Sequence, residues 1–115
     1  MSVSFGGIGE IAATFMTSGT IKAGDTVKMA ASGTVTACAA GERFCGVVLG
    51  GESGGHAAVQ VGGYVKLPYT GSAPTVGYGC LEAAGAGKVQ VDADGTSEVL
   101  IVDVDTAAET VGFFM

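Results

Sequence analysis

The sequence predicts an all-β fold: a single compact β-barrel or β-sandwich domain of short antiparallel strands, with little or no helix. Apolar residues alternate with period two in several short stretches, and turn signals recur about every 8 to 12 residues. No window shows the apolar period of a helix. Only residues 106–110 could form a helical turn, and that segment is too short to be stable alone.

The segment around which the other strands are expected to pack runs from Phe44 to Tyr69. Residues 44–50 are apolar on both faces, which is typical of a central strand, and residues 57–67 place apolar side chains at odd positions. Because this parity continues across Gly62 and Gly63, we predict one long strand with a glycine kink or bulge rather than two unrelated strands. The glycine-rich residues 50–55 would join the two stretches into a hairpin.

Eight to ten short strands are expected in all. Outside residues 44–69 they are expected at residues 8–16, 26–29, 34–37, 80–83, 88–92, 98–105 and 110–115. The last of these could close the sheet or pack across one end. Asp94-Gly95 is a hairpin signal between two of them, and residues 70–79 should form an ordered loop. We find no tandem repeat and no linker, so residues 1–7 are interpreted as a short N-terminal arm and residues 8–115 as one β domain.

The composition indicates a protein that lies against a partner. Only 14% of the 115 residues are charged, whereas about a quarter is usual in isolated soluble domains. We therefore expect part of the Ala/Gly/Val surface to be covered, although a plain Gly/Ala-rich monomer is the alternative. The net charge is −6 and the five basic residues are scattered, which argues against nucleic-acid binding.

No segment indicates a membrane or export. No run approaches the roughly 20 uninterrupted apolar residues of a membrane span, and the N-terminus lacks the basic and apolar regions of a signal peptide. We expect a cytosolic protein, or one assembled in the cytosol.

The residues that could carry thiol or imidazole chemistry lack the required arrangement. His56 would need a nucleophile beside it and a third group to orient its ring. Cys38, Cys45 and Cys80 lie in small apolar contexts typical of core cysteines. Their spacing lacks the CxxC of closed zinc sites, and their odd number favours reduced thiols.

The acidic residues also have simpler explanations than catalysis or metal binding. Asp92, Asp94 and Glu98 resemble a calcium loop but lack its ligand spacing and its flanking helices. Asp103 and Asp105 share a strand face, where charges keep an edge strand from pairing with other chains. Gly6-Gly7-Ile8-Gly9 lacks the strand–loop–helix context of a phosphate site. We therefore expect no enzyme, no cofactor and no metal.

The order of four segments resembles that of small tailed-bacteriophage capsid decoration (cement) proteins. These segments are GDTVKM at 24–29, AGERFCGVV at 40–48, VQVGGYV at 59–65 and VGYGCL at 76–81, and the resemblance covers roughly residues 20 to 105. It implies a β-barrel or β-tulip-like domain on the outer surface of a phage head, assembled in the host cytoplasm. Such proteins often form a homotrimer at local three-fold positions and clamp subunits of the major capsid protein.

The resemblance suggests two sets of contact residues. We expect the arm residues Ser2, Val3, Ser4 and Phe5 to dock on the capsid, because backbone pairing adds hydrogen bonds without side-chain chemistry. Phe113, Phe114 and Met115 would supply an apolar anchor, in the core or between subunits.

The alternative function is a sugar- or ligand-binding β-module of a phage fibre or tail accessory protein. Tyr64, Tyr69 and Tyr78 would then serve as stacking platforms. Sugar sites usually pair aromatic rings with several Asp, Asn or Gln groups, however, and this chain has no Asn.

Overall fold

The computed structural model describes residues 10–50, 53–85, 87–92, 95 and 98–115. Over these residues the chain is all-β with no helix, which confirms the predicted fold class. The ten strands are β1 (Ile11–Ser18), β2 (Thr26–Ala31), β3 (Thr34–Ala37), β4 (Gly46–Val48), β5 (His56–Gly62), β6 (Tyr64–Pro68), β7 (Gly77–Ala83), β8 (Val89–Val91), β9 (Glu98–Asp105) and β10 (Thr110–Phe114). The described part of the chain contains no helix long and apolar enough to cross a membrane.

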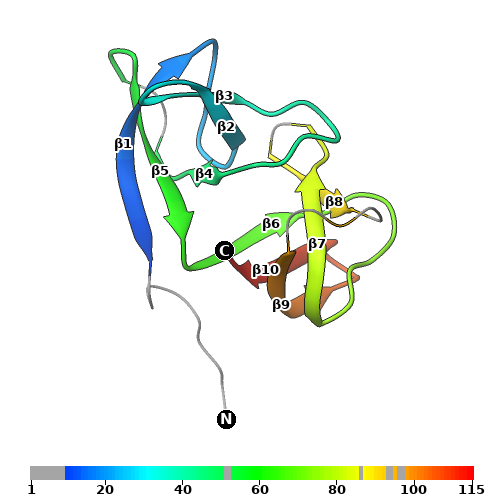
Figure 1. Cartoon of the computed structure of the whole chain (residues 1–115). Coiled ribbons are helices and arrows are strands. Elements are labelled where there is room, and N and C mark those ends of the chain that lie inside the picture. Colours follow the sequence, from blue (N-terminus) through cyan, green and yellow to red (C-terminus); the bar gives the residue numbers. More distant parts are fainter. Residues whose placement is uncertain (1–9, 51–52, 86, 93–94, 96–97) are drawn as a thin grey trace.

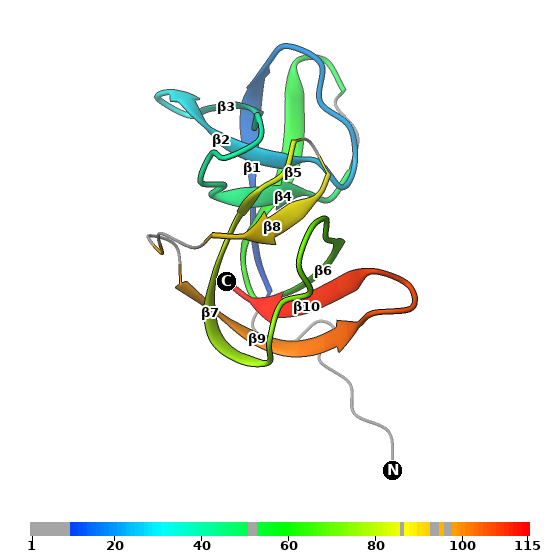
Figure 2. The same cartoon turned by 90° about the vertical axis from the view of Figure 1, so that its right-hand side faces the viewer.

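The strands form two five-stranded units that follow one another along the chain (Figures 1 and 2). The first unit is a closed barrel with the order β1-β3-β2-β4-β5. The second unit is a sheet with the order β6-β10-β9-β7-β8. Its two edges are joined by a parallel bridge between Tyr69, directly after β6, and Val89 of β8.

The two units have the same topology. Because of that bridge, the second unit can be traced as β6-β8-β7-β9-β10, which is the order of the first unit strand for strand. β1 is parallel to β3 and β6 runs parallel to β8, whereas the other described pairs are antiparallel. Thr17 pairs with Val35 in the first unit, and Tyr69 pairs with Val89 at the equivalent place in the second. No tandem repeat was predicted, so the repeated topology is a finding of the structure. The two parallel contacts also differ from the prediction, which was of antiparallel strands.

Each unit has its own hydrophobic core, and β4 lies between them. Val48 belongs to the core of the first unit, with Val27 and Val59 among its members. Val47, the preceding residue, points the other way and belongs to the core of the second unit. Successive side chains of a strand point to opposite faces, so a strand with two apolar faces can be buried by both cores. This confirms that residues 44–50 contain a central strand.

The pairing of β4 with β5 explains the glycine that begins β4. Val47 pairs with Gln60 and Val48 with Val59, as the predicted hairpin requires. A Cβ atom at Gly46 would lie 2.6 Å from the Gln60 carbonyl oxygen and 2.7 Å from Cγ1 of Val59. Only glycine allows the backbones to approach this closely.

The chain leaves the first unit at Gly63. The prediction of one long strand over residues 57–67 is wrong, because β5 and β6 belong to different sheets. Gly63 has φ of 94°, a left-handed conformation that glycine adopts without steric cost. The buried amide of Gln60 fixes the corner: its Nε2 donates to the carbonyl oxygens of Gly62 at 3.0 Å and Tyr64 at 2.9 Å.

The predicted bounds of one strand are confirmed, whereas one predicted hairpin is wrong. β9 has the bounds predicted from its alternation, and β10 pairs with β6 and β9 on its two sides, so the C-terminal strand lies within the sheet. The hairpin signal at Asp94-Gly95 was wrong: β8 and β9 both pair with β7. Residues 93–94 themselves, like the N-terminal part of the strand expected over 8–16, lie outside the described residues.

We expect Gln60→Leu to destabilise the protein by about 2 kcal/mol, because two carbonyl oxygens at the corner lose their donor. Urea unfolding followed by circular dichroism measures this. Gln90→Leu is the matched control, since Gln90 is partly buried on β8 and no hydrogen bond of its side chain is described. Equal losses for the two variants would contradict the role given to the Gln60 amide.

Candidate interaction surfaces

The C-terminal residues predicted as an anchor lie in different environments. Phe113 is fully buried in the second core, where its ring meets Phe44 edge to face at 6.0 Å. The sequence left open whether Phe113 lies in the core or between subunits, and the structure places it in the core. Phe114 is partly buried and packs edge to face against Tyr64, with ring centres 5.6 Å apart. Met115 lines a cleft, as described below. The arm residues Ser2, Val3, Ser4 and Phe5 lie outside the described residues.

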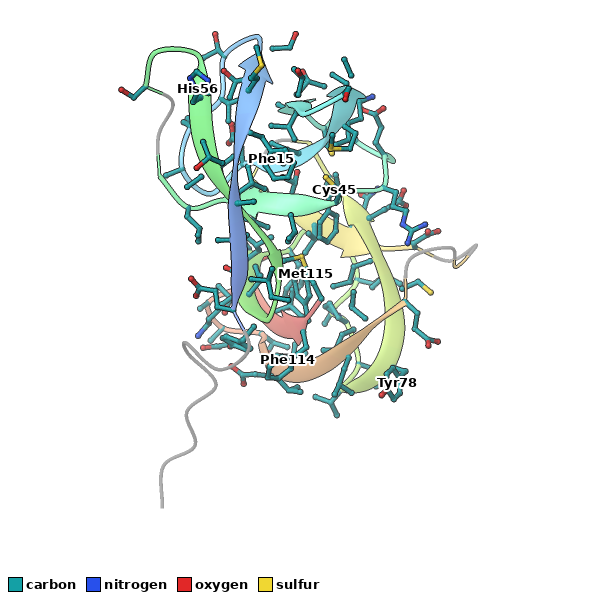
Figure 3. The ribbon with its side chains drawn as sticks, turned by 60° about the vertical axis from the view of Figure 1, so that its left-hand side comes forward. Phe15, Cys45, His56, Tyr78, Phe114 and Met115 are labelled. Carbon is teal, nitrogen blue, oxygen red and sulfur yellow. The ribbon has the colours of Figure 1, made fainter. Side chains whose placement is uncertain are left out.

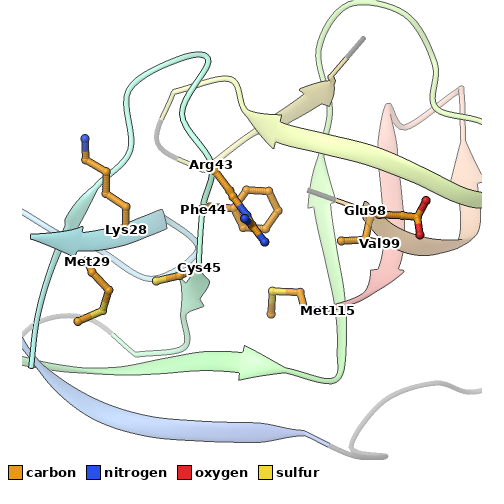
Figure 4. A pocket seen from close by; sticks show the side chains of 8 residues that line it. All are labelled: Lys28, Met29, Arg43, Phe44, Cys45, Glu98, Val99 and Met115. Carbon is orange, nitrogen blue, oxygen red and sulfur yellow. The ribbon is translucent and has the colours of Figure 1, made fainter. Parts of the chain in front are cut away.

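A cleft of about 390 Å³ lies where the two units meet (Figure 4). We call it the junction cleft. Its lining comes from β2, the segment before β4, the start of β9 and the C-terminus, and consists of Lys28, Met29, Arg43, Phe44, Cys45, Glu98, Val99 and Met115.

The charges around the junction cleft are of both signs. Lys28 forms an ion pair with Glu42, and this contact, with the N–H of Ala39, lowers the pKa of the Glu42 carboxyl. Arg43 and Glu98 are both exposed at its rim. The cleft therefore has no excess of positive or negative charge that would attract a charged ligand. Its other lining side chains contain sulfur or are apolar.

A second surface carries no charge. Val76, Tyr78 and Val91 are all exposed, and the Tyr78 side chain is 75% exposed at the outer end of β7 (Figure 3). They border a depression of about 270 Å³, which we call the Tyr78 face. All of its lining residues are uncharged: Ser72, Ala73, Pro74, Thr75, Val76, Tyr78, Gly79, Cys80, Val91 and Ile101.

The Tyr78 face was not predicted as a surface. One feature of the sequence could have indicated it, because residues 69–81 contain no charged residue. The sequence does not show, however, which of these side chains point outward. Tyr69 is buried in the second core, whereas Tyr78, nine positions later, is largely exposed.

The three tyrosines do not form a common stacking platform. Tyr69 is buried in the core and Tyr64 is packed on Phe114, so only Tyr78 presents most of its ring to solvent. Of the aromatic residues predicted for a sugar site, the structure leaves one fully available.

The three cysteines are free thiols and, like the histidine, lie in different environments. Cys38 is buried, Cys80 is partly buried and Cys45 is exposed at the junction cleft. His56 is exposed beside the β4–β5 turn, with Nδ1 3.1 Å from the Gly54 carbonyl oxygen (Figure 3). Within the described ranges, no three His, Cys, Asp or Glu side chains are grouped so as to hold a metal ion.

The paired strand carboxylates make structural contacts. Asp103 lies 4.0 Å from the Lys66 ammonium on a neighbouring part of the sheet. Asp105 accepts hydrogen bonds from the N–H groups of Ala107 and Ala108 and so holds the turn between β9 and β10.

Comparison of the sequence with protein-family models and with curated proteins finds no match. We therefore infer the function from the surfaces described above.

The buried Cys38 makes stability depend on alkaline pH. Burial, with a smaller contribution from the negative charge of Glu42, raises the pKa of the Cys38 thiol from 9.0 to about 11. Between these values the unfolded chain loses the thiol proton and the folded chain keeps it. The free energy of unfolding therefore falls as the pH rises from 9 to 11, by at most about 1.4 kcal/mol per pH unit from this group.

Urea unfolding of the reduced protein and of Cys38→Ala at several pH values from 8 to 11 measures this contribution. We expect the stability of the wild type to fall more steeply than that of Cys38→Ala. Parallel profiles would contradict the assignment, since tyrosine and lysine titrations are common to both proteins.

Proposed function

We propose that this chain is a structural virion protein without catalytic activity, which binds the outer surface of a phage head and stabilises the lattice of the major capsid protein. The observation that carries the proposal is the Tyr78 face: an exposed, uncharged surface on a protein of net charge −6. The resemblance in segment order to cement proteins supplies the identity of the partner and the site of assembly, the host cytoplasm.

The chemistry of the Tyr78 face suits contact with a protein. No charge has to be desolvated there, and Ala73, Pro74 and Gly79 lose little or no rotamer freedom when they are covered. Tyrosine is among the residues that contribute most to binding energy at protein interfaces, especially beside a pocket. Tyr78 is therefore the expected centre of the contact.

The backbone beneath this face belongs to the sheet. Gly77 to Cys80 of β7 pair with β9, and Leu81 to Ala83 pair with β8, so each part of β7 is paired along one edge. A surface held in this way is ordered before it binds, which reduces the entropic cost of association. Contact by the arm residues Ser2 to Phe5 would add to the binding of this face, and association between copies would raise avidity further.

The test uses phage heads that lack this protein, prepared from a phage in which its gene is deleted. Purified protein should co-sediment with these heads saturably and should raise the temperature at which they release DNA. Tyr78→Ser should weaken binding about tenfold or more, because the central aromatic contact is lost. Deletion of Ser2 to Phe5 measures the contribution of the arm.

Leu49→Ser is the matched control, because Leu49 is an exposed apolar residue on the first unit, away from the Tyr78 face. It should bind as the wild type does. Absence of saturable binding to the heads would overturn the proposal. Saturable glycan binding that depends on Tyr78, without binding to heads, would favour the ligand-binding module instead.

A further inference from the structure

One edge of the first unit has no partner among the described residues. β1 pairs with β5 along nearly its whole length, from Ile11 to Met16. On its other side it pairs with β3 only over Met16 to Ser18. Residues 11–15 therefore have one free edge, which lies on the outside of the molecule, away from β5 (Figure 1). Ile11, at its start, is 61% exposed.

The hydrogen bonds of the neighbouring residues identify which backbone groups face outward. The Met16 N–H donates to the Gly33 carbonyl on the β3 side, and the Thr17 N–H donates to Gly55 on the β5 side. Residues of a strand alternate between its two edges, so the N–H and C=O groups of Ala12 and Thr14 point to the free edge. The register shift at Ile11 does not change this parity, because the extra residue of the bulge belongs to β5.

The equivalent edge of the second unit is protected. It belongs to β6, where the N–H of Tyr69 pairs toward β10 and that of Thr70 toward β8. The outward groups are therefore those of the even residues. The carbonyl of Tyr64 accepts from Gln60, Lys66 carries an exposed charge, and Pro68 has no N–H to offer.

Charges and prolines are the usual means by which proteins keep an edge strand from pairing with other chains. Two units of the same topology thus differ at this edge, protected in one and bare in the other. The difference indicates that the edge of β1 is covered in the assembled protein.

We propose that β1 pairs antiparallel with β1 of a second copy, about a two-fold axis at Ala13. Ala12 of each copy would then exchange two hydrogen bonds with Thr14 of the other. This gives a partner to every outward N–H and C=O group of residues 11–15. Ala13 faces its own counterpart in a non-hydrogen-bonded pair, where strands approach most closely and a small side chain fits. Ile11 of each copy faces Phe15 of the other, an apolar cross-strand pair.

The distribution of charge favours a second copy as the occupant. Seven of the eleven acidic residues, but only two of the five basic ones, fall in residues 64–115. The first unit is therefore close to neutral, and residues 11–15 contain no charge. Pairing through β1 joins the nearly neutral units and keeps the acidic ones apart. The result is a two-fold pair, in contrast to the three-fold association that the resemblance implies, and it does not depend on binding to phage heads.

Sedimentation equilibrium of the full chain in solution tests the pairing. We expect a monomer–dimer equilibrium that Thr14→Pro and Thr14→Lys each weaken at least tenfold. Proline removes an outward N–H without touching the β5 ladder, and lysine places a charge at the edge. Thr106→Lys, in an exposed turn, adds the same charge and should dimerise as the wild type does. Circular dichroism identifies any variant that fails to fold, and if Thr14→Pro does so, Thr14→Lys decides.

Disulfide formation tests the axis itself. In a Cys45→Ser background, Ala13→Cys should give a disulfide-linked dimer at least tenfold faster than Ala30→Cys, which is exposed on β2 away from the proposed axis. A monomer at all concentrations, a trimer, dimerisation that Thr14→Lys does not change, or equal rates for the two cysteine variants would each overturn the proposal.

Discussion

The structure depends on one strand serving two cores. β4 contains only three residues, and its two valines are buried by different units: Val48 by the first and Val47 by the second. Its glycine allows the close approach to β5, and the Gln60 amide turns the chain at the end of β5. A charge or a bulky side chain in this strand would disturb both cores at once. The units therefore cannot separate without exposing β4.

The repeated topology explains how a chain of this size can carry two different surfaces. Five strands in the same order supply each unit with a core, but the loops and edges differ. In the second unit, Lys66 and Pro68 protect the edge of β6, while the long connection before β7 forms part of the Tyr78 face. In the first unit, residues 11–15 of β1 carry no charge, and one of their edges has no partner within the described part of the chain. The duplication thus separates the two contacts that we propose: side-chain contact on the second unit and backbone pairing on the first.

The sequence predicted the strands well because period-two alternation reports directly which faces are buried. This is why β9 and the β4–β5 hairpin were found. The break at Gly63 was missed because the alternation continues unchanged across a corner that joins two sheets. The duplication was missed because equivalent core positions need only be apolar: Val27 of β2 faces the interior as Leu81 of β7 does, without any identity between them. The surfaces were the least predictable part, because packing between strands distant in the sequence decides that Tyr69 is buried and Tyr78 exposed.

The two proposed contacts answer the question raised by the composition, namely why so few residues are charged. A uniformly uncharged surface would bind many proteins without selectivity. Here seven of the eleven acidic residues fall in residues 64–115, and the lining of the Tyr78 face is uncharged, so the partner we propose must match a small uncharged area on an acidic unit. In the pairing that we propose, the edge of β1 accepts an extended strand with small side chains. On this proposal the chain has few charged residues because both contact surfaces must be free of charge.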